Sequence, residues 1–468
     1  MLKKLFSHTA IYGLAPQIPK IASIVALPII TKYLTEVDFG VYGVITAIAG
    51  SIAVLSNLGL NVILSNVFYK SPGQYKWAWR QIYGFLMLWN IPFSILLSII
   101  LYFFIPPEAI HDAGYIILLN VLPVVFFGPT SILGNMYYQL KQKPMQIAIR
   151  SIIFGFLSVG LNVLFIAGLK MGYMGWFLSI CISGMLSQIS YWWPLNRKLG
   201  LRPIFNFKRR YIRNSLKVSL PTVPHYYSAY LLDASDRAVM KILNVSTGDI
   251  GKYNAAYIVA NIIQKLGIAA GQAVAPMLNQ SYKNNKEIEA RSLIFVLQIA
   301  FLCLTFILSI WLKEIFVLLI KNKDLASVYP LGIIIVMSYN YRPMYLGANG
   351  KLFFYEKTKV LLKVTFSAGI INLILNFILI KYFGYKAAAF TTFFALMYMG
   401  YAGYFSKEYK ETKKIEYYPL IWLVCTILLT CVAYFSVELS IGFKVLMSFL
   451  LMSIALIALK KIVLNEKR

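Results

Sequence analysis

Long apolar runs alternate with short polar segments along the whole chain. Each run is about twenty residues long, which is the length that an α-helix needs to cross the hydrocarbon core of a bilayer. We predict fourteen spanning helices, near 9–32, 40–69, 80–105, 113–139, 146–168, 173–194, 215–241, 250–282, 291–312, 326–350, 360–380, 386–405, 418–436 and 443–459. The pattern therefore predicts an all-α polytopic membrane protein.

Composition agrees with this prediction and removes one alternative. The chain is 59% hydrophobic and 13% charged, with a mean hydropathy of +0.69. The net charge of +28 could suggest nucleic-acid binding, but the basic residues lie between apolar runs, where membrane orientation requires them. No nucleic-acid partner and no cofactor are expected. The four cysteines lie in apolar runs and have no metal-ligand spacing.

The loops predict the orientation. With fourteen spans, most of the 45 Lys and Arg residues fall in the loops of one side, so both termini are expected in the cytoplasm. The outside loops are short, and no GxSxG, HExxH or DxD site is evident, so we do not expect an enzyme.

One nine-residue motif occurs twice. Segments 34–42 and 245–253 each contain an apolar residue, a hydroxyl residue, two spacers and Asp-x-Gly-x-Tyr, with Asp38 and Asp249 211 residues apart. Each Asp is placed to cap the incoming helix, and each Gly allows two helices to approach closely. A second match, Leu161-Asn162 with Leu375-Asn376, has an offset of 214.

The two matches predict a duplicated fold. We expect a six-helix lobe over 1–210, a second six-helix lobe over 211–416, and an appended helix pair over 417–468. Two lobes with the same topology around a cleft are typical of an alternating-access carrier.

Segment 28–40, PIITKYLTEVDFG, strongly resembles the first-helix signature of Wzx-type polysaccharide and O-antigen flippases. These flippases belong to the multidrug/oligosaccharidyl-lipid/polysaccharide (MOP) exporter superfamily. Asp236-Arg237 followed by 245–253 resembles that family's seventh-to-eighth-helix segment, and the resemblance covers roughly residues 1–410. It implies translocation of undecaprenyl-diphosphate-linked oligosaccharide for O-antigen, capsule or another polymer. It also implies ion-gradient coupling and a location in the lipid of a bacterial inner membrane. Polymerase and chain-length proteins of the same pathway are further expected partners.

Four cations in predicted spans are candidate ligands for the diphosphate: Lys20, Arg237, Lys265 and Arg342. Ionisable residues are costly in a bilayer and usually face protein or a water-filled cavity. Arg342 precedes Pro343, so its guanidinium could instead bind backbone carbonyls that the proline frees. Lys20 could instead pair with a carboxylate.

Two carboxylates in the seventh span, Asp233 and Asp236, are candidates for binding H+ or Na+ as the coupling ion. The open alternative is local neutralisation, because Asp233 and Arg237 are four residues apart on one helix. Four cations against two carboxylates suit a diphosphate. A drug-cation exporter of the same superfamily, which remains an alternative function, would need the opposite sign. A membrane glycan polymerase or transferase is the second alternative.

Overall fold

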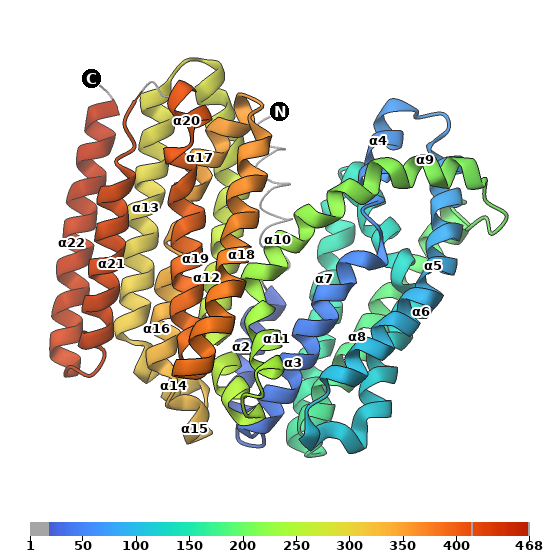
Figure 1. The fold of residues 1–468 in the computed structure, drawn as a ribbon, viewed down its shortest axis with the longest axis horizontal. Coiled ribbons are helices and arrows are strands. Elements are labelled where there is room, and N and C mark those ends of the chain that lie inside the picture. Colours follow the sequence, from blue (N-terminus) through green and yellow to red (C-terminus); the bar gives the residue numbers. More distant parts are fainter. Residues whose placement is uncertain (1–17, 413–414, 467–468) are drawn as a thin grey trace. The chain divides into compact units, whose positions relative to one another are not determined.

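The computed structural model describes residues 18–412 and 415–466, and all of its regular elements are helices (Figure 1). The chain divides into two compact units. Among the described residues, unit 1 contains 18–230 and 246–251, and unit 2 contains 231–245, 252–412 and 415–466. This confirms the predicted all-α class. The predicted division at 210 and 416 stays a prediction.

The elements of unit 1 begin with α2 (Ile18–Ile30), α3 (Glu36–Ala53), η2 (Val54–Ser56), α4 (Asn61–Lys70), α5 (Tyr75–Phe104), η3 (Pro107–Asp112) and α6 (Ala113–Leu140). They continue with α7 (Pro144–Asn162), η4 (Val163–Gly168), α8 (Tyr173–Trp193), η5 (Pro194–Lys198), α9 (Arg209–Ser219), η6 (Leu220–Thr222) and most of α10 (Val223–Asp233). The start of α12 (Thr247–Lys283) also belongs to this unit.

Unit 2 contains α11 (Ser235–Ile242), the rest of α12, α13 (Glu287–Ile310), α14 (Leu312–Leu319), α15 (Lys323–Ala326) and α16 (Tyr329–Ser338). It continues with α17 (Tyr341–Phe354), α18 (Thr358–Phe383), α19 (Ala387–Tyr401), η7 (Ala402–Phe405), α20 (Lys407–Thr412), α21 (Pro419–Ser436) and α22 (Ile441–Glu466).

Nine of the helices in the described ranges are long and apolar enough to cross a membrane, and α2 is a shorter apolar helix. The count of fourteen is not confirmed, partly because several predicted spans are interrupted. Span 215–241 divides into α9, η6, α10 and α11, and span 326–350 divides between α16 and α17. Pro221 lies at the first interruption, and Pro343 lies in the first turn of α17, where its missing N–H costs nothing. Residues 9–17 of the first predicted span lie outside the described part.

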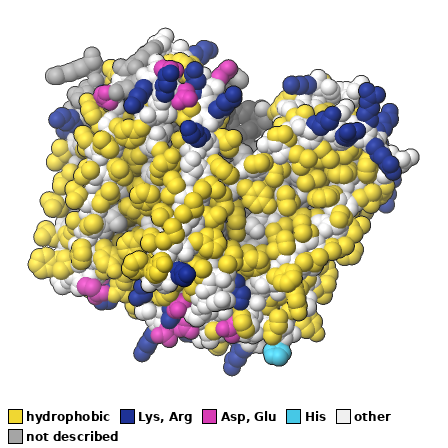
Figure 2. All heavy atoms as spheres, viewed as in Figure 1, with side chains coloured by type: hydrophobic (Ala, Val, Ile, Leu, Met, Phe, Trp, Pro, Cys, Tyr) yellow, Lys and Arg dark blue, Asp and Glu magenta, His cyan; other side chains and the backbone are white. Residues whose placement is uncertain are grey.

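Hydrophobic side chains cover the middle of each unit and charges gather at the ends (Figure 2). Large apolar residues are exposed on these surfaces, for example Phe103 at 74% and Phe435 at 77%. An apolar exterior of this extent is stable only when lipid covers it. The protein is therefore a multi-pass membrane protein.

The repeated motif begins a helix in both of its copies. At the start of α3, the Thr35 hydroxyl accepts from the Asp38 N–H at 3.2 Å, and the Asp38 carboxylate accepts from the Thr35 N–H at 2.7 Å. At the start of α12, the Ser246 hydroxyl likewise accepts from the Asp249 N–H at 3.1 Å. The hydroxyl residue, and not the Asp predicted from the sequence, is thus the cap in each copy, and in the first copy the Asp completes a capping box.

The two motif glycines bring α3 and the first turns of α12 into backbone contact within unit 1. A Cβ on Gly40 would lie 1.9 Å from the Thr247 carbonyl oxygen, and one on Gly251 would lie 1.8 Å from the Glu36 carbonyl oxygen. Glu36 and Thr247 are 211 residues apart, as are Gly40 and Gly251, so the two contacts are equivalent. We call this contact the glycine crossing. It confirms the close approach predicted from the sequence.

The C-terminal helix pair is fixed to unit 2 by packing and by polar contacts at one end. Helices α21 and α22 both pack on α13. Lys444 of α22, with a side chain only 1% exposed, pairs with Glu314 of α14 at 2.6 Å. Trp311 donates its indole N–H to Ser448 at 3.2 Å.

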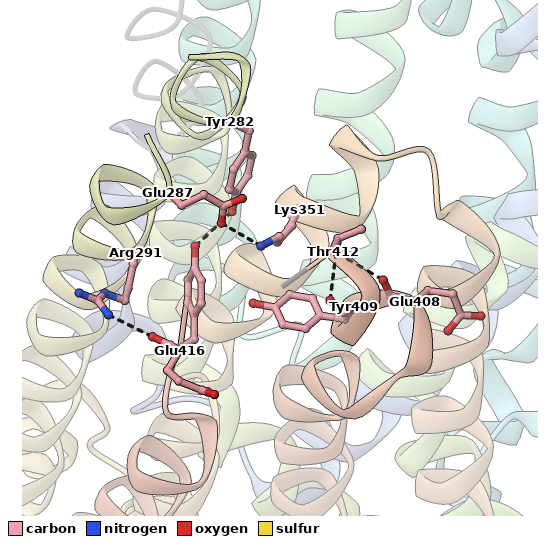
Figure 3. A network of polar contacts seen from close by, with 9 residues as sticks. Tyr282, Glu287, Arg291, Lys351, Glu408, Tyr409, Thr412 and Glu416 are labelled. Atoms are coloured by element: carbon pink, nitrogen blue, oxygen red, sulfur yellow. Dashed lines mark hydrogen bonds and ion pairs between the residues drawn. The ribbon is translucent and has the colours of Figure 1, made fainter. Parts of the chain in front are cut away.

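A buried ion pair joins α13 to α17 near the α12–α13 turn (Figure 3). Lys351 and Glu287 are 2.8 Å apart, with side chains 0% and 6% exposed. The Lys351 ammonium also lies 5.6 Å from the centre of the Tyr409 ring, and Tyr282 and Tyr417 share a hydrogen bond of 3.4 Å beside the pair. Such a pair fixes the register of its helices, since either charge alone would be buried without compensation.

Lys351→Met is expected to destabilise the protein by about 3–5 kcal/mol, because Glu287 is left buried without its cation. The measurement is the thermal unfolding midpoint of the purified protein. The double variant Lys351→Met/Glu287→Met is expected to recover most of the loss, since no buried charge remains. Lys286→Met is the control, because its pair with Glu289 is exposed and worth at most about 1 kcal/mol. Equal effects of the two lysine substitutions would contradict this account.

Candidate functional site

The candidate site in unit 2 is built around a helix break. Helix α10 ends at Asp233, Ala234 has φ −143° and ψ −9°, and α11 begins at Ser235. Asp236 therefore lies in the first turn of a new helix, where a negative charge is favoured by the helix dipole. The Ser235 hydroxyl donates to the Leu231 carbonyl at 2.6 Å across the break. Breaks of this kind occur where a carrier binds an ion.

Asp236 is completely buried and receives hydrogen bonds from three other helices. One carboxylate oxygen, Oδ2, accepts from Tyr253 at 2.5 Å and Tyr257 at 3.4 Å, both on α12, and from Thr392 of α19 at 3.0 Å. The other, Oδ1, accepts from the Asn376 amide of α18 at 2.7 Å. All four donors are neutral. A buried carboxylate must be satisfied in this way, because burying a charge without partners is costly.

Two further polar side chains, Thr391 and Asn372, extend this set of contacts. Thr391 donates its hydroxyl to the Asn376 side-chain oxygen. Asn372 lies one turn before Asn376 and, with its amide nitrogen turned toward the carboxylate, donates to Asp236 at 3.0 Å and to the Leu231 carbonyl at 3.2 Å. We call Asp236, Tyr253, Tyr257, Asn372, Asn376, Thr391 and Thr392 the Asp236 cluster. A change in the charge of the Asp236 carboxylate therefore alters hydrogen bonds on α11, α12, α18 and α19 together.

Arg237 follows Asp236 in the chain but points to other partners. Its side chain donates to the Asn254 amide oxygen at 3.0 Å, and its guanidinium lies 4.5 Å from the centre of the Tyr257 ring. Only 7% of the residue is exposed. The guanidinium therefore packs beside the Asp236 cluster, where it balances the buried negative charge.

The other predicted cations lie on different helices. Lys20 is exposed on α2, in unit 1. Lys265 of α12 and Arg342 of α17 are half-buried in unit 2. Arg342 donates to the Tyr341 hydroxyl at 3.2 Å and lies against α12, where a Cβ on Gly267 would approach its Cγ to 3.2 Å. The Asp233 side chain lies outside the described residues.

Most of the Asp236 cluster was not predicted as a site from the sequence. Asn376 and Tyr253 were noticed only as repeated residues, in the Leu-Asn pair and in Asp-x-Gly-x-Tyr. The signal that could have found them is polarity inside apolar spans, which also marks Asn372, Thr391 and Thr392. Such residues are common in helix packing, so that signal alone does not select a site.

Solved structures with the same fold include membrane transporters and a lipid flippase. The lipid II flippase MurJ in an inward closed conformation matches with 14% identity and a TM-score of 0.69, covering 93% of this chain and 99% of that one. A point mutant of the Vibrio cholerae MATE transporter VcmN matches with 13% identity and a TM-score of 0.60, covering 87% and 96%. A MOP superfamily transporter from Pyrococcus furiosus matches with 12% identity and a TM-score of 0.55, covering 91% and 95%.

These likenesses show that the chain has a fold found in membrane transporters and in a lipid flippase. The chain belongs to the family described as polysaccharide biosynthesis protein, whose model matches residues 5–282. No curated protein sequence matches it. The resemblance found in segment 28–40 agrees with this family and with the shared fold.

Proposed function

We propose that the protein flips an undecaprenyl-diphosphate-linked oligosaccharide from the cytoplasmic to the outer leaflet of a bacterial inner membrane. The family match favours a role in polysaccharide biosynthesis, and the fold is one that flippases and drug exporters share. The headgroup would be held by cations inside the membrane while the prenyl chain stays in lipid. Lobes built from the two repeats would expose the headgroup alternately to each side.

The observation that carries this proposal is the charge placed within apolar helices. Lys20, Lys265 and Arg342 lie on α2, α12 and α17, whereas Asp236 is enclosed by its own donors. The carboxylate is therefore already satisfied, and the cations give the apolar helices a positive balance. A diphosphate fits this balance, because positive groups in a medium of low dielectric attract it strongly. The same positive balance would repel the substrate of an organic-cation exporter.

We further propose that the Asp236 cluster couples flipping to an ion gradient. A proton would turn the carboxylate from an acceptor into a donor, and Na+ would need the carboxylate, amide and hydroxyl oxygens to turn toward it. Either event rearranges hydrogen bonds on α12, α18 and α19 at once. Arg237 would then tune the charge of the cluster, and the same cluster would include Asp233 if its carboxylate also binds the ion.

The experiment that tests the function is depletion of the protein in its own bacterium, followed by location of the diphosphate-linked oligosaccharide. Accumulation on the cytoplasmic face, with loss of surface polymer, is the expected result. Delivery of single repeat units without polymer would instead identify a polymerase. Unchanged glycan with increased drug sensitivity would identify a multidrug exporter.

Arg342→Ala is expected to lower glycan delivery by a factor on the order of 100, because two charge-assisted hydrogen bonds to phosphate are lost. Arg342→Lys should retain part of the activity, since lysine supplies the charge without the planar fork. The measurement is surface glycan at matched protein levels. Lys381→Ala, an exposed cation near the end of α18, is the control. Normal surface glycan in Arg342→Ala would remove the phosphate role of Arg342.

A further inference from the structure

The carboxylates of unit 1 are confined to one end of it. Residues 39–107 and 113–230 contain no Asp or Glu. The acidic residues of the unit are Glu36, Asp38, Glu108, Asp112 and Asp249. Asp38 and Asp112 both accept hydrogen bonds from Tyr173. Glu108 accepts one from Thr247 at the glycine crossing, to which Glu36 also belongs, so these residues lie at one end of the unit. The other end, which we call the basic end, carries Lys70, Lys76, Arg80, Lys141, Lys143, Arg150, Arg197, Lys198, Arg202, Lys208, Arg209, Arg210, Arg213 and Lys217. Figure 2 shows cations gathered over this part of unit 1.

Membrane orientation does not account for the missing carboxylates. The positive-inside rule depends on Lys and Arg, and Asp and Glu contribute little to it. The predicted cytoplasmic end of unit 2 obeys the same rule with acidic residues present, and pairs such as Lys286–Glu289 and Lys351–Glu287 form there. The purely cationic character is therefore a property of unit 1 itself.

Several cations at the basic end rest on aromatic rings. The Lys141 ammonium lies 5.3 Å from the centre of the Phe68 ring, and the Arg150 guanidinium lies 4.6 Å from that of Tyr191. Lys208 lies 5.5 Å from the centre of the Trp77 ring. An aromatic face holds a cation without cancelling its charge. The field of these side chains therefore remains able to attract an anion.

Helix α9 presents part of this charge in an ordered row. Arg209, Arg213 and Lys217 are spaced four residues apart, so they share one face of the helix, and all three are exposed. The adjoining face, where Ile212 and Ser215 are buried, packs against α4 and α5 (Figure 1). The Lys208 N–H before the helix donates to the Gln81 side-chain oxygen of α5 at 2.7 Å. The row of cations is thus fixed to the unit.

A groove of about 520 Å³ runs beside this row. Its apolar lining includes Phe85 of α5, Phe207 before α9, and Leu216 of α9, and the three cations of the row also line it. The rings of Phe85 and Phe207 meet edge to face with their centres 5.6 Å apart. The groove therefore combines an apolar floor with a cationic rim, which is the arrangement that an anionic amphiphile requires.

We propose that this groove binds an anionic phospholipid of the membrane. The phosphate lies against Arg209, Arg213 and Lys217, and an acyl chain lies on Phe85, Phe207 and Leu216. Charge complementarity selects the headgroup, and the apolar floor excludes a soluble phosphate as the preferred ligand. The proposal does not depend on which substrate the protein transports.

The test is native mass spectrometry of the purified full-length protein with phosphatidylglycerol or phosphatidylcholine added. The variant Arg209→Gln/Arg213→Gln/Lys217→Gln is expected to bind phosphatidylglycerol at least about tenfold more weakly, given the contribution of each basic residue at an anionic surface. Its binding of phosphatidylcholine should not change. Each single Gln variant should show part of the loss, which keeps the test valid if the triple variant folds poorly.

The matched control is Lys70→Gln/Lys141→Gln/Lys143→Gln. It removes the same charge from exposed positions of the basic end that do not line the groove. If this control bound phosphatidylglycerol as weakly as the groove variant does, the binding would depend only on the overall positive charge of the basic end. That result would overturn the groove as a site. Tighter binding of undecaprenyl diphosphate than of phosphatidylglycerol, lost in the Arg209/Arg213/Lys217 variant alone, would make the occupant a prenyl lipid and would also overturn the proposal.

Discussion

Cysteines placed at Glu36 and Gly248 are expected to form a disulfide that stops transport until a reducing agent is added. The Glu36 Cβ lies 3.7 Å from the position of a Cβ on Gly248, and disulfides require about 3.5–4.5 Å between these atoms. We propose that the glycine crossing opens in each transport cycle. A covalent link across it would then hold the protein in one state. The four native cysteines, Cys181, Cys303, Cys425 and Cys431, would first be replaced by serine.

The measurement is glycan delivery at equal protein levels, with cross-linking followed by mass spectrometry of the peptides. Each single-cysteine variant, treated with the same oxidant, is the control and should transport normally. A complete cross-link with unchanged transport would show that the crossing is static. In that case the two glycines would be needed for the protein to fold, because a Cβ at Gly40 or Gly251 would clash with the backbone, and not for movement during transport.

Asp236→Asn is expected to abolish the dependence of transport on the ion gradient while the protein remains folded. The amide has the shape of the carboxylate but cannot take up a proton or supply a negative charge to Na+. Coupling between two sites is typically worth about 5- to 150-fold in affinity, and this whole factor should disappear. The measurement is flipping in proteoliposomes with an imposed Na+ or H+ gradient, one ion at a time.

Asp324→Asn serves as the matched control, since Asp324 is an exposed carboxylate on the short helix α15 of the same unit. Thr392→Val should weaken the coupling less than Asp236→Asn does, because one of several donors is removed. A variant Asp236→Asn that still responds fully to both gradients would move the coupling ion to another site.

The sequence predicted the fold class correctly because the constraint is physical and local. A bilayer of fixed thickness demands apolar runs of about twenty residues, and these can be counted directly. The duplicated motif was also visible, because its residues lie within nine positions of one another. The structure, however, gives the capping role to Thr35 and Ser246 and not to the predicted Asp residues. Helix interruptions were harder to predict, because the break at Ala234 contains neither glycine nor proline.

The candidate site could be predicted only in part. Asp236 stood out because a charge in an apolar run is costly. Its partners did not, because Asn376 and Thr392 are 140 and 156 residues away in the chain. The sequence assigns Arg237 to the diphosphate from its charge, while in the structure its contacts include Asn254 and the rings of Tyr253 and Tyr257. The phosphate role of Arg237 stays a prediction.

The sequence by itself determined that this chain spans the membrane many times, and it showed a resemblance to a flippase superfamily. It also predicted that the two halves of the chain are related. Each of these depends on composition or on residues close together in the chain. The tertiary structure alone decided that Asp236 is enclosed by donors from three other helices and that Gly40 and Gly251 lie in one helix crossing. It also placed the cations of α9 beside an apolar groove. The hydrophobic pattern indicates which residues are removed from water. In a membrane protein almost every face of a helix is removed from water, so the pattern does not distinguish the faces that contact lipid from those that contact protein. Which faces then meet is set by shape and hydrogen bonding between segments that are distant in sequence.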